Sequence, residues 1–261
     1  MADLSAVIIT KNEARRIQRC LDSIRWIPEI IIVDDQSSDE TVTICKRYTN
    51  KIIIHSLNED FAAQRNIGTQ AATQQWVLQL DADEKVTEQA RCVIEEALMS
   101  KKKEITAFSL IRENHFLGRR MRFGGWSERA VKLFKRENGR YEGRVHESLH
   151  VSGRVNNLNA VIEHYPFDTF SDCLEKLNRY TSLEAKMMME QNPSVPPKEC
   201  DYQMTWRTLK LFWKIYVKKQ GFREGLPGLV FASFWALGHF MKWTKYWELT
   251  GKCVWDLTEE F

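Results

Sequence analysis

Two carboxylates stand two residues apart in the segment LDADE, where Asp81 and Asp83 follow the apolar run WVLQL. A pair of this kind at a strand end can hold one hard divalent cation, which can also take the oxygens of a diphosphate. Such a cation neutralises the charge that grows on a departing nucleoside diphosphate. Acidic loop residues also form turns and cap helices, so the pair alone is a weak indication.

Three further polar segments precede this pair. Asp34 and Asp35 follow the apolar run EIIIV, in the segment IIIVDDQSSDET. The first apolar run of the chain ends in ITKNE, and a later segment reads AAQRNIG. The polar residues of these two segments that could contact a ligand are Thr10, Lys11, Asn12, Glu13, Arg65 and Asn66.

These segments lie between elements that predict an α/β domain. Apolar runs predict buried strands over 4–10, 29–33, 51–55 and 76–80, and apolar spacing predicts helices over 17–24, 39–48 and 61–73. Strands and helices that alternate in this way form βαβ units and a mostly parallel sheet. Ligands bind beyond the carboxyl ends of the strands in such sheets, which is where the acidic segments are expected to lie.

The pattern changes after about residue 105. Short β-like runs separated by glycine-containing turns predict a mixed or antiparallel extension, and a helical pattern begins after Pro166. The segment NPSVPP, 192–197, is predicted to be a linker. With 43% hydrophobic and 28% charged residues, the chain has the composition of a folded protein.

The ordered set VIITKNE, IIIVDDQSSDET, AAQRNIG and LDADE resembles the inverting family 2 glycosyltransferases with the GT-A fold. The resemblance implies a Rossmann-like α/β fold, with a mostly parallel central sheet, helices on both faces and a C-terminal helical extension. We expect a GT-A catalytic domain over 1–165, with a nucleotide-sugar-binding half (1–100) and an acceptor and catalytic-base half (101–165). The helical, basic and aromatic C-terminal region would occupy 166–261.

The resemblance also implies roles for particular residues. The nucleoside would be held by Thr10, Lys11, Glu13 and Asp35, and Arg65 would orient the diphosphate or an acidic neighbour. Asp81 would lie near the ribose and the metal, and Asp83 would be the main ligand of a divalent ion, Mg²⁺ or Mn²⁺. The chain departs from the family at Gln36, where many members have glycine, and at Lys11, where many have an aromatic residue.

Inverting transfer needs a carboxylate that removes the proton of the acceptor hydroxyl. The segment from WSER to VHESL resembles a subgroup of the family that includes bacterial lipopolysaccharide-core β-1,4-glucosyltransferases. Glu147 is predicted to be this base, oriented by His146, with Glu128 as the second candidate. Glu147 could instead be a strand-edge carboxylate paired to Arg144. Trp126 could face a sugar ring or belong to the core. The lone histidines, among them His164, have no metal-ligand spacing and receive no role.

The segment from Tyr202 to Phe222 contains no acidic residue. One helical face carries basic residues and the opposite side carries aromatic and apolar residues. This pattern is typical of a helix at a membrane surface, although a helix that packs its apolar side on the protein gives the same pattern. The run 226–241 is shorter than a membrane span and is predicted to be a buried or interfacial hairpin helix. The basic residues are Arg207, Lys210, Lys214 and Lys218; the others are Trp206, Leu209, Trp213, Tyr216 and Val217.

The resemblance implies an enzyme that moves glucose from UDP-glucose to a lipid-linked glycan acceptor, lipopolysaccharide core or a similar one. The start MADLSAVIITKNE has no signal-peptide pattern, so we expect the chain in the cytoplasm. The basic, aromatic C-terminal region predicts that it attaches to the cytoplasmic face of the inner membrane. One alternative is a metal-dependent nucleotidyltransferase, although TKNEARR lacks a glycine-rich phosphate loop. Another is a non-catalytic module that binds membrane or nucleic acid. That reading leaves the acidic strand ends without a purpose, and we expect no nucleic-acid partner.

Overall fold

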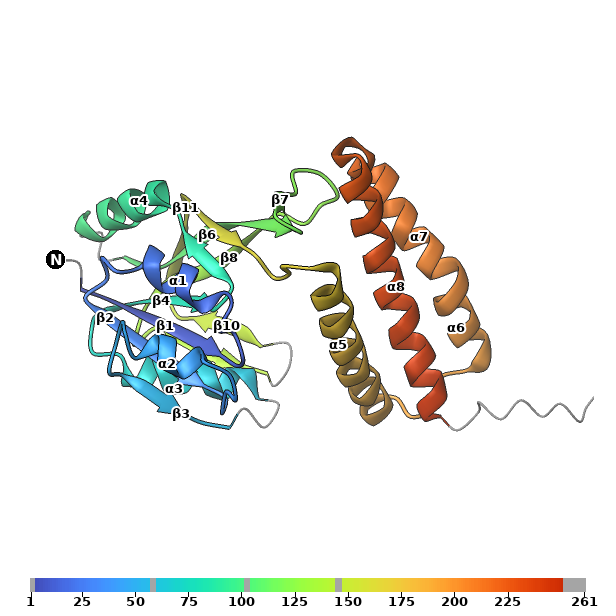
Figure 1. The fold of residues 1–261 in the computed structure, drawn as a ribbon, viewed down its shortest axis with the longest axis horizontal. Helices are drawn as coiled ribbons and strands as arrows, with labels where there is room; N and C mark the ends of the chain where they lie inside the picture. Colours follow the sequence, from blue (N-terminus) through green and yellow to red (C-terminus); the bar gives the residue numbers. More distant parts are fainter. Residues whose placement is uncertain (1–2, 57–59, 101–103, 144–146, 251–261) are drawn as a thin grey trace, which may run out of the picture. The chain divides into compact units, whose positions relative to one another are not determined.

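A computed structural model describes residues 3–56, 60–100, 104–143 and 147–250. The chain divides into two compact units (Figure 1). The first comprises Met1–Asn114 and Ser127–Tyr165, and the second comprises His115–Trp126 and Pro166–Phe261. The short segment His115–Trp126 therefore belongs with the C-terminal helices, although it lies in the middle of the sequence.

The first unit is built on a mixed sheet in which the strand order is β3-β2-β1-β4-β8-β6-β11-β5. Strands β3, β2, β1 and β4 run parallel to one another, and so do β6 and β11. Strand β8 lies antiparallel between β4 and β6 and joins these two parallel groups. The strands are β1 Leu4–Thr10, β2 Glu29–Asp34, β3 Ile52–Ile54, β4 Trp76–Asp81, β5 Glu84–Val86, β6 Ile105–Phe116, β8 Glu128–Lys135 and β11 Arg154–His164.

The parallel strands alternate their apolar side chains between two cores, because neighbouring residues of a strand point to opposite faces. On one face, Leu4, Ala6 and Ile8 pack with helices α1 (Ile17–Ser23), α2 (Thr41–Cys45) and α4 (Glu88–Met99). On the other face, Val7 packs with helix α3 (Phe61–Ala71) and the hairpin of β9 (Gly139–Glu142) and β10 (Ser148–Val151). The predicted α/β fold, with a mostly parallel sheet between helices, is confirmed.

Helix α3 approaches the sheet closely at Gly68, the last residue of AAQRNIG. A Cβ atom placed on Gly68 would lie 2.3 Å from Val7 Cγ1 and 3.0 Å from Val33 Cγ2. Only glycine allows this spacing between helix and strands. Gly68 therefore sets the distance between α3 and the sheet, and with it the position of Arg65 and Asn66 on the same helix.

The second unit consists of long helices that lie side by side (Figure 1). Its core is aromatic and joins Phe116 and Met121 to Phe231 and Phe234. The elements are β7 Arg119–Arg120, α5 Phe170–Gln191, α6 Pro197–Tyr202, the π-helical turn η1 Gln203–Arg207, α7 Thr208–Trp213, the π-helical turn η2 Lys214–Lys218, the 3-10 turn η3 Gly221–Glu224 and α8 Leu226–Leu249. Among the described residues, no helix combines the length and the apolar character needed to cross a membrane.

Candidate active site

The carboxyl ends of three adjacent strands bring the predicted site residues to one edge of the sheet. In the strand registers, Asp34 lies opposite Thr10, and Asp81 lies opposite Ile9. The amide of Asp35 donates to the carbonyl of Thr10 at 2.9 Å, which holds the two loops together beyond the strands. Strand β1 is thus flanked on both sides by acidic strand ends, as the βαβ pattern predicted.

The loop after β1 is tied to the loop after β2. Lys11 Nζ donates to Asp35 Oδ2 at 2.6 Å, and the Asp35 side chain is buried. The amide of Glu13 donates to Thr41 Oγ1, while its carboxylate pairs with Arg16 at 2.8 Å. Gln36, at the position where many family members have glycine, has a φ of 51°. The turn therefore keeps the left-handed backbone that favours glycine even though the residue is glutamine.

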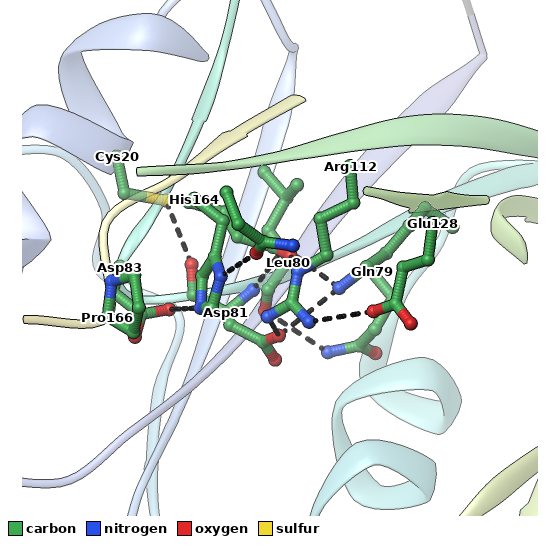
Figure 2. Close-up of polar contacts among 12 residues, drawn as sticks. Cys20, Gln79, Leu80, Asp81, Asp83, Arg112, Glu128, His164 and Pro166 are labelled. Atoms are coloured by element: carbon green, nitrogen blue, oxygen red, sulfur yellow. Dashed lines mark hydrogen bonds and ion pairs between the residues drawn. The ribbon is translucent and has the colours of Figure 1, made fainter. Parts of the chain in front are cut away.

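Asp81, at the end of β4, is paired with three cations, of which Arg112 is labelled in Figure 2. Its Oδ1 lies 2.8 Å from Arg65 Nη2, and its Oδ2 lies 3.2 Å from Lys132 Nζ and 3.4 Å from Arg112 Nη2. Burial opposes the ionised form of this carboxyl group, but Lys132, Arg65 and Arg112 hold its pKa well below the ordinary value. Asp81 is therefore a fixed negative charge whose two oxygens both face protein cations.

A second buried carboxylate, Glu84, shares two of these cations. Glu84 accepts from Lys132 Nζ at 2.8 Å and from the amide of Asp81 at 2.9 Å, and it pairs with Arg112 Nε at 2.8 Å. The sequence did not single out Glu84, Arg112 or Lys132. Lys132 lies at a register shift where β8 pairs with β6, between Val131 and Leu133, and a bulge of this kind redirects a side chain.

Arg65 joins Asp81 at this edge of the sheet to Glu147, the predicted base. Its Nε lies 2.9 Å from Glu147 Oε1, while Nη2 of the same buried guanidinium holds Asp81. Burial opposes the charge of Arg65, yet Asp81 and Glu147 raise its pKa, so it stays a cation. Asn66 fixes β9, the strand that precedes Glu147, because its side chain both donates to and accepts from the backbone of Tyr141.

Asp83 lies beside a histidine that the sequence had left without a role. Nε2 of His164 is 3.4 Å from Asp83 Oδ1, and Nδ1 of the same ring donates to Asn114 Oδ1 at 2.5 Å (Figure 2). His164 is the last residue of β11, opposite Asn114 on one neighbouring strand and Glu84 on the other. A ring whose far nitrogen is fixed by an oxygen acceptor is the usual arrangement of a metal-binding histidine.

The donor set at Asp83 and His164 fits a divalent ion that is completed by its substrate. Mg²⁺ and similar ions are commonly held by one or two protein groups together with substrate phosphates and water. Among the described residues, no group of three or more His, Cys, Asp or Glu side chains is arranged to hold a metal ion by itself. Two protein ligands and a diphosphate are consistent with both observations.

The glycosyl transferase family 2 model matches residues 5–156 of the chain, which include the acidic strand ends, Arg65 and Glu147.

The chain belongs to glycosyl transferase family 2.

The transferase also has relatives along nearly its whole length. An uncharacterised glycosyltransferase of Rickettsia felis is 26% identical over 258 residues, covering 94% of this chain and 89% of the relative. The lipopolysaccharide core biosynthesis glycosyltransferase LpsC of Rhizobium meliloti is 25% identical over 257 residues, covering 94% of this chain and 92% of LpsC. The crystal structure of S. aureus TarS 1–349 with UDP-GlcNAc is similar at a TM-score of 0.44 and 13% identity, covering 95% of this chain and 90% of that one. The family and these two relatives identify the chain as a glycosyltransferase.

The sequence also named a second candidate base, a candidate sugar-binding aromatic residue and two neighbours of Glu147. Glu128, the second candidate base, is exposed at the start of β8 and pairs with Arg112 at 3.3 Å. Trp126 packs in the aromatic core of the helical unit, with its ring centroid 4.9 Å from that of Phe231. Arg144 and His146 lie outside the described residues, and the described partner of Glu147 is Arg65.

Proposed function

We propose that this transferase moves glucose from UDP-glucose, with inversion, to a lipid-linked glycan acceptor of the lipopolysaccharide-core class. The observation that carries the proposal is the Arg65 bridge, which links a carboxylate of the strand-end cluster to a carboxylate of the β9–β10 hairpin. Donor binding and acceptor deprotonation need carboxylates from different parts of the chain within one site. The acceptor class is supported by the similarity to LpsC over nearly the full length of both chains.

In this proposal, residues 1–100 bind the nucleotide sugar, and residues 101–165 supply the acceptor side and the base. Thr10, Lys11, Glu13 and Asp35 surround the nucleoside. The ion pair of Lys11 with Asp35 supports this role, because it keeps one Asp35 oxygen fixed beside the strand ends. Residues 166–261 attach the enzyme to the cytoplasmic face of the inner membrane.

Asp83 and His164 are proposed as the protein ligands of a divalent ion, Mg²⁺ or Mn²⁺. The ion supplies positive charge that stabilises the leaving diphosphate. Asp81 was also predicted to contact the metal, and its oxygens already face Arg65, Lys132 and Arg112. We therefore give Asp83 the main ligand role, and Asp81 the role of fixing Arg65 near the ribose and diphosphate.

Glu147 is proposed as the general base. Nε of Arg65 lies 2.9 Å from Glu147 Oε1, so this ion pair must open before that oxygen can take the proton of the acceptor hydroxyl. A bound diphosphate competes for the same guanidinium, since arginine binds phosphate and carboxylate oxygens in the same way. Donor binding would then release the Glu147 carboxylate for the acceptor hydroxyl.

The experiment is a donor screen followed by two substitutions in the full chain. Wild type is incubated with a panel of UDP-sugars and Mn²⁺ or Mg²⁺, and slow release of UDP is measured without acceptor. UDP-glucose is expected to give the fastest metal-dependent hydrolysis. Asp83→Ala should abolish this hydrolysis. Glu147→Gln should keep donor binding, measured by thermal shift, and lose transfer to a lipopolysaccharide-core acceptor.

Glu137→Gln is the matched control, because Glu137 is an exposed carboxylate in the turn between β8 and β9. Its hydrolysis and transfer should equal those of wild type. Full transfer by Glu147→Gln would remove the base assignment. Metal-independent hydrolysis, or hydrolysis that Asp83→Ala leaves intact, would remove the metal assignment. A donor panel that shows another sugar as the best substrate would correct the choice of glucose.

A further inference from the structure

Three large apolar side chains lie on the outer side of the helical run 197–218. Trp206 is 70% exposed, Leu209 is 61% exposed and Trp213 is 56% exposed. The spacing of three and four residues puts them on one helical face. The opposite side of the run packs into the aromatic core through Leu211, Phe212 and Ile215, among others. The helix thus has two apolar sides, and the part of the chain that the structure describes covers only one of them.

A basic stripe runs beside this exposed apolar face. Arg207, Lys210, Lys214 and Lys218 are all exposed, and no acidic residue occurs between Asp201 and Glu224. Glu224 does not neutralise the stripe, because it is buried and its Oε1 accepts from the amides of Arg122 and Phe123.

The same character continues past the end of this helical run. Phe222 is 50% exposed and Leu226 is 71% exposed at the turn into α8. Arg223 lies beside them, with its guanidinium carbon 4.1 Å from the centroid of the Phe123 ring. We call Trp206, Leu209, Trp213, Phe222 and Leu226, together with the basic stripe, the cationic-aromatic face.

We propose that the cationic-aromatic face binds the surface of an anionic lipid bilayer, with the helical run 197–218 lying along that surface. Exposed tryptophan and leucine side chains enter the boundary between headgroups and acyl chains, and the adjacent lysines meet lipid phosphates. This inference deepens the proposed function, because it names the residues that bring the enzyme to a lipid-linked acceptor.

Other occupants fit this face less well. A symmetric contact with a second copy would set basic stripes against each other, and like charges in such a contact repel. A single-stranded nucleic acid would use stacking on the two tryptophans, but Leu209 and Leu226 offer no ring on which a base can stack. A bilayer uses the aliphatic side chains, the tryptophans and the positive charge at the same time.

The test is co-sedimentation of the full chain with vesicles of phosphatidylcholine alone, or with phosphatidylglycerol added. Wild type is expected to bind the anionic vesicles and to bind phosphatidylcholine vesicles weakly. Trp206→Ser combined with Trp213→Ser should lower the partition coefficient at least about tenfold, because both side chains leave the interface. Lys210→Gln combined with Lys214→Gln should lower it roughly 25-fold, at about fivefold for each lysine.

Matched controls come from exposed positions of the first unit. Met99 is 74% exposed, so Met99→Ser removes a similarly exposed apolar side chain. Lys46→Gln combined with Arg47→Gln removes two exposed cations. Both controls should bind anionic vesicles like wild type, and every variant should keep the thermal midpoint of wild type.

The proposal is overturned if wild type fails to bind anionic vesicles, or if the variants of the face and the controls bind equally. Self-association without lipid that Trp206→Ser abolishes would assign the face to a second copy. Binding of a single-stranded oligonucleotide, without vesicle binding, would assign it to nucleic acid. Hydrolysis of UDP-glucose in solution needs no lipid. A wild type that hydrolyses UDP-glucose but does not bind anionic vesicles therefore refutes this inference alone. A wild type that binds the vesicles but does not hydrolyse UDP-glucose refutes the proposed donor chemistry alone.

Discussion

Replacing Lys132 with methionine should destabilise the first unit strongly. Lys132 is buried and is shared by two carboxylates, at 3.2 Å from Asp81 and 2.8 Å from Glu84. Methionine keeps most of the volume and removes the charge. Removing one partner of a buried ion pair costs about 3–5 kcal/mol. Because Arg65 and Arg112 remain beside Asp81, we expect the lower end of this range, about 3 kcal/mol at pH 7.5.

The pH dependence separates this electrostatic loss from lost packing. The folded state of the wild type lowers the pKa of Asp81, so the stability from Asp81 is present above pH 4 or so and disappears as the pH falls further. In Lys132→Met that pKa rises, because the cation that lowers it most is gone. The difference in the free energy of unfolding between wild type and variant should therefore be largest at neutral pH and shrink below about pH 4.

The assay is urea unfolding of both proteins from pH 3.5 to 7.5, followed by tryptophan fluorescence. Lys135→Met is the matched control on the same strand. Lys135 lies over the ring of Trp76 at 5.7 Å, and this contact is worth less than about 1 kcal/mol at a partly exposed site. A loss below about 1 kcal/mol for Lys132→Met, or a loss that does not change with pH, would refute the reasoning that Lys132 neutralises Asp81 and Glu84.

Three further predictions concern the fold and the Arg65 bridge. Gly68→Ala should lower the free energy of unfolding in urea by about 1–3 kcal/mol, because its Cβ would lie 2.3 Å from Val7 Cγ1. Adding Val7→Ala to this variant should recover part of the loss. A Gly68→Ala variant more stable than wild type would contradict the close packing. Burial opposes ionisation of Glu29, but Lys51, Ser5 and Thr73 lower its pKa to about 2. The stability that this carboxylate contributes is therefore complete above about pH 4.5 and is lost as the pH falls toward 2. Glu29→Gln should lower the free energy of unfolding by about 1–3 kcal/mol at pH 7, and by less in acid. A loss at pH 3 as large as that at pH 7 would contradict the role given to the ionised Glu29. Arg65→Lys keeps the charge but cannot bind Asp81 and Glu147 together, so kcat/KM for transfer should fall about 100-fold while donor hydrolysis falls much less. Equal losses of transfer and of donor hydrolysis would show that Arg65 does not position Glu147.

The strand ends could be predicted because their cause is local. A run of apolar residues long enough for a strand, followed by acids and a helix pattern, defines both the strand and the point where it ends. The sequence therefore placed Thr10, Asp35 and Asp81 at one edge before any pairing was known. The alternation of Leu4, Ala6 and Ile8 against Val7 follows from the same pattern, since both faces of the strand are buried.

The cations of the cluster could not be predicted because their position depends on pairing between distant segments. Lys132 occurs in AVKLFK, where an alternating strand puts lysine toward solvent. It is buried because β8 lies between β4 and β6 and shifts register at this residue. His164 reaches Asp83 because β11 pairs with both β5 and β6, which join segments about 50 and 80 residues away. No local pattern contains that information.

Because residues 115–126 belong to the helical unit, truncating the enzyme has a structural consequence. The chain passes between the two units at three places: after Asn114, after Trp126 and after Tyr165. Deleting the C-terminal helices would leave Phe116 and Met121, both buried in the aromatic core, with their partners removed. A truncated enzyme would then expose these apolar side chains to solvent, and the C-terminal helices transferred alone would lack part of their core. The two units should therefore be expressed together, and surface substitutions are the better means of separating their functions.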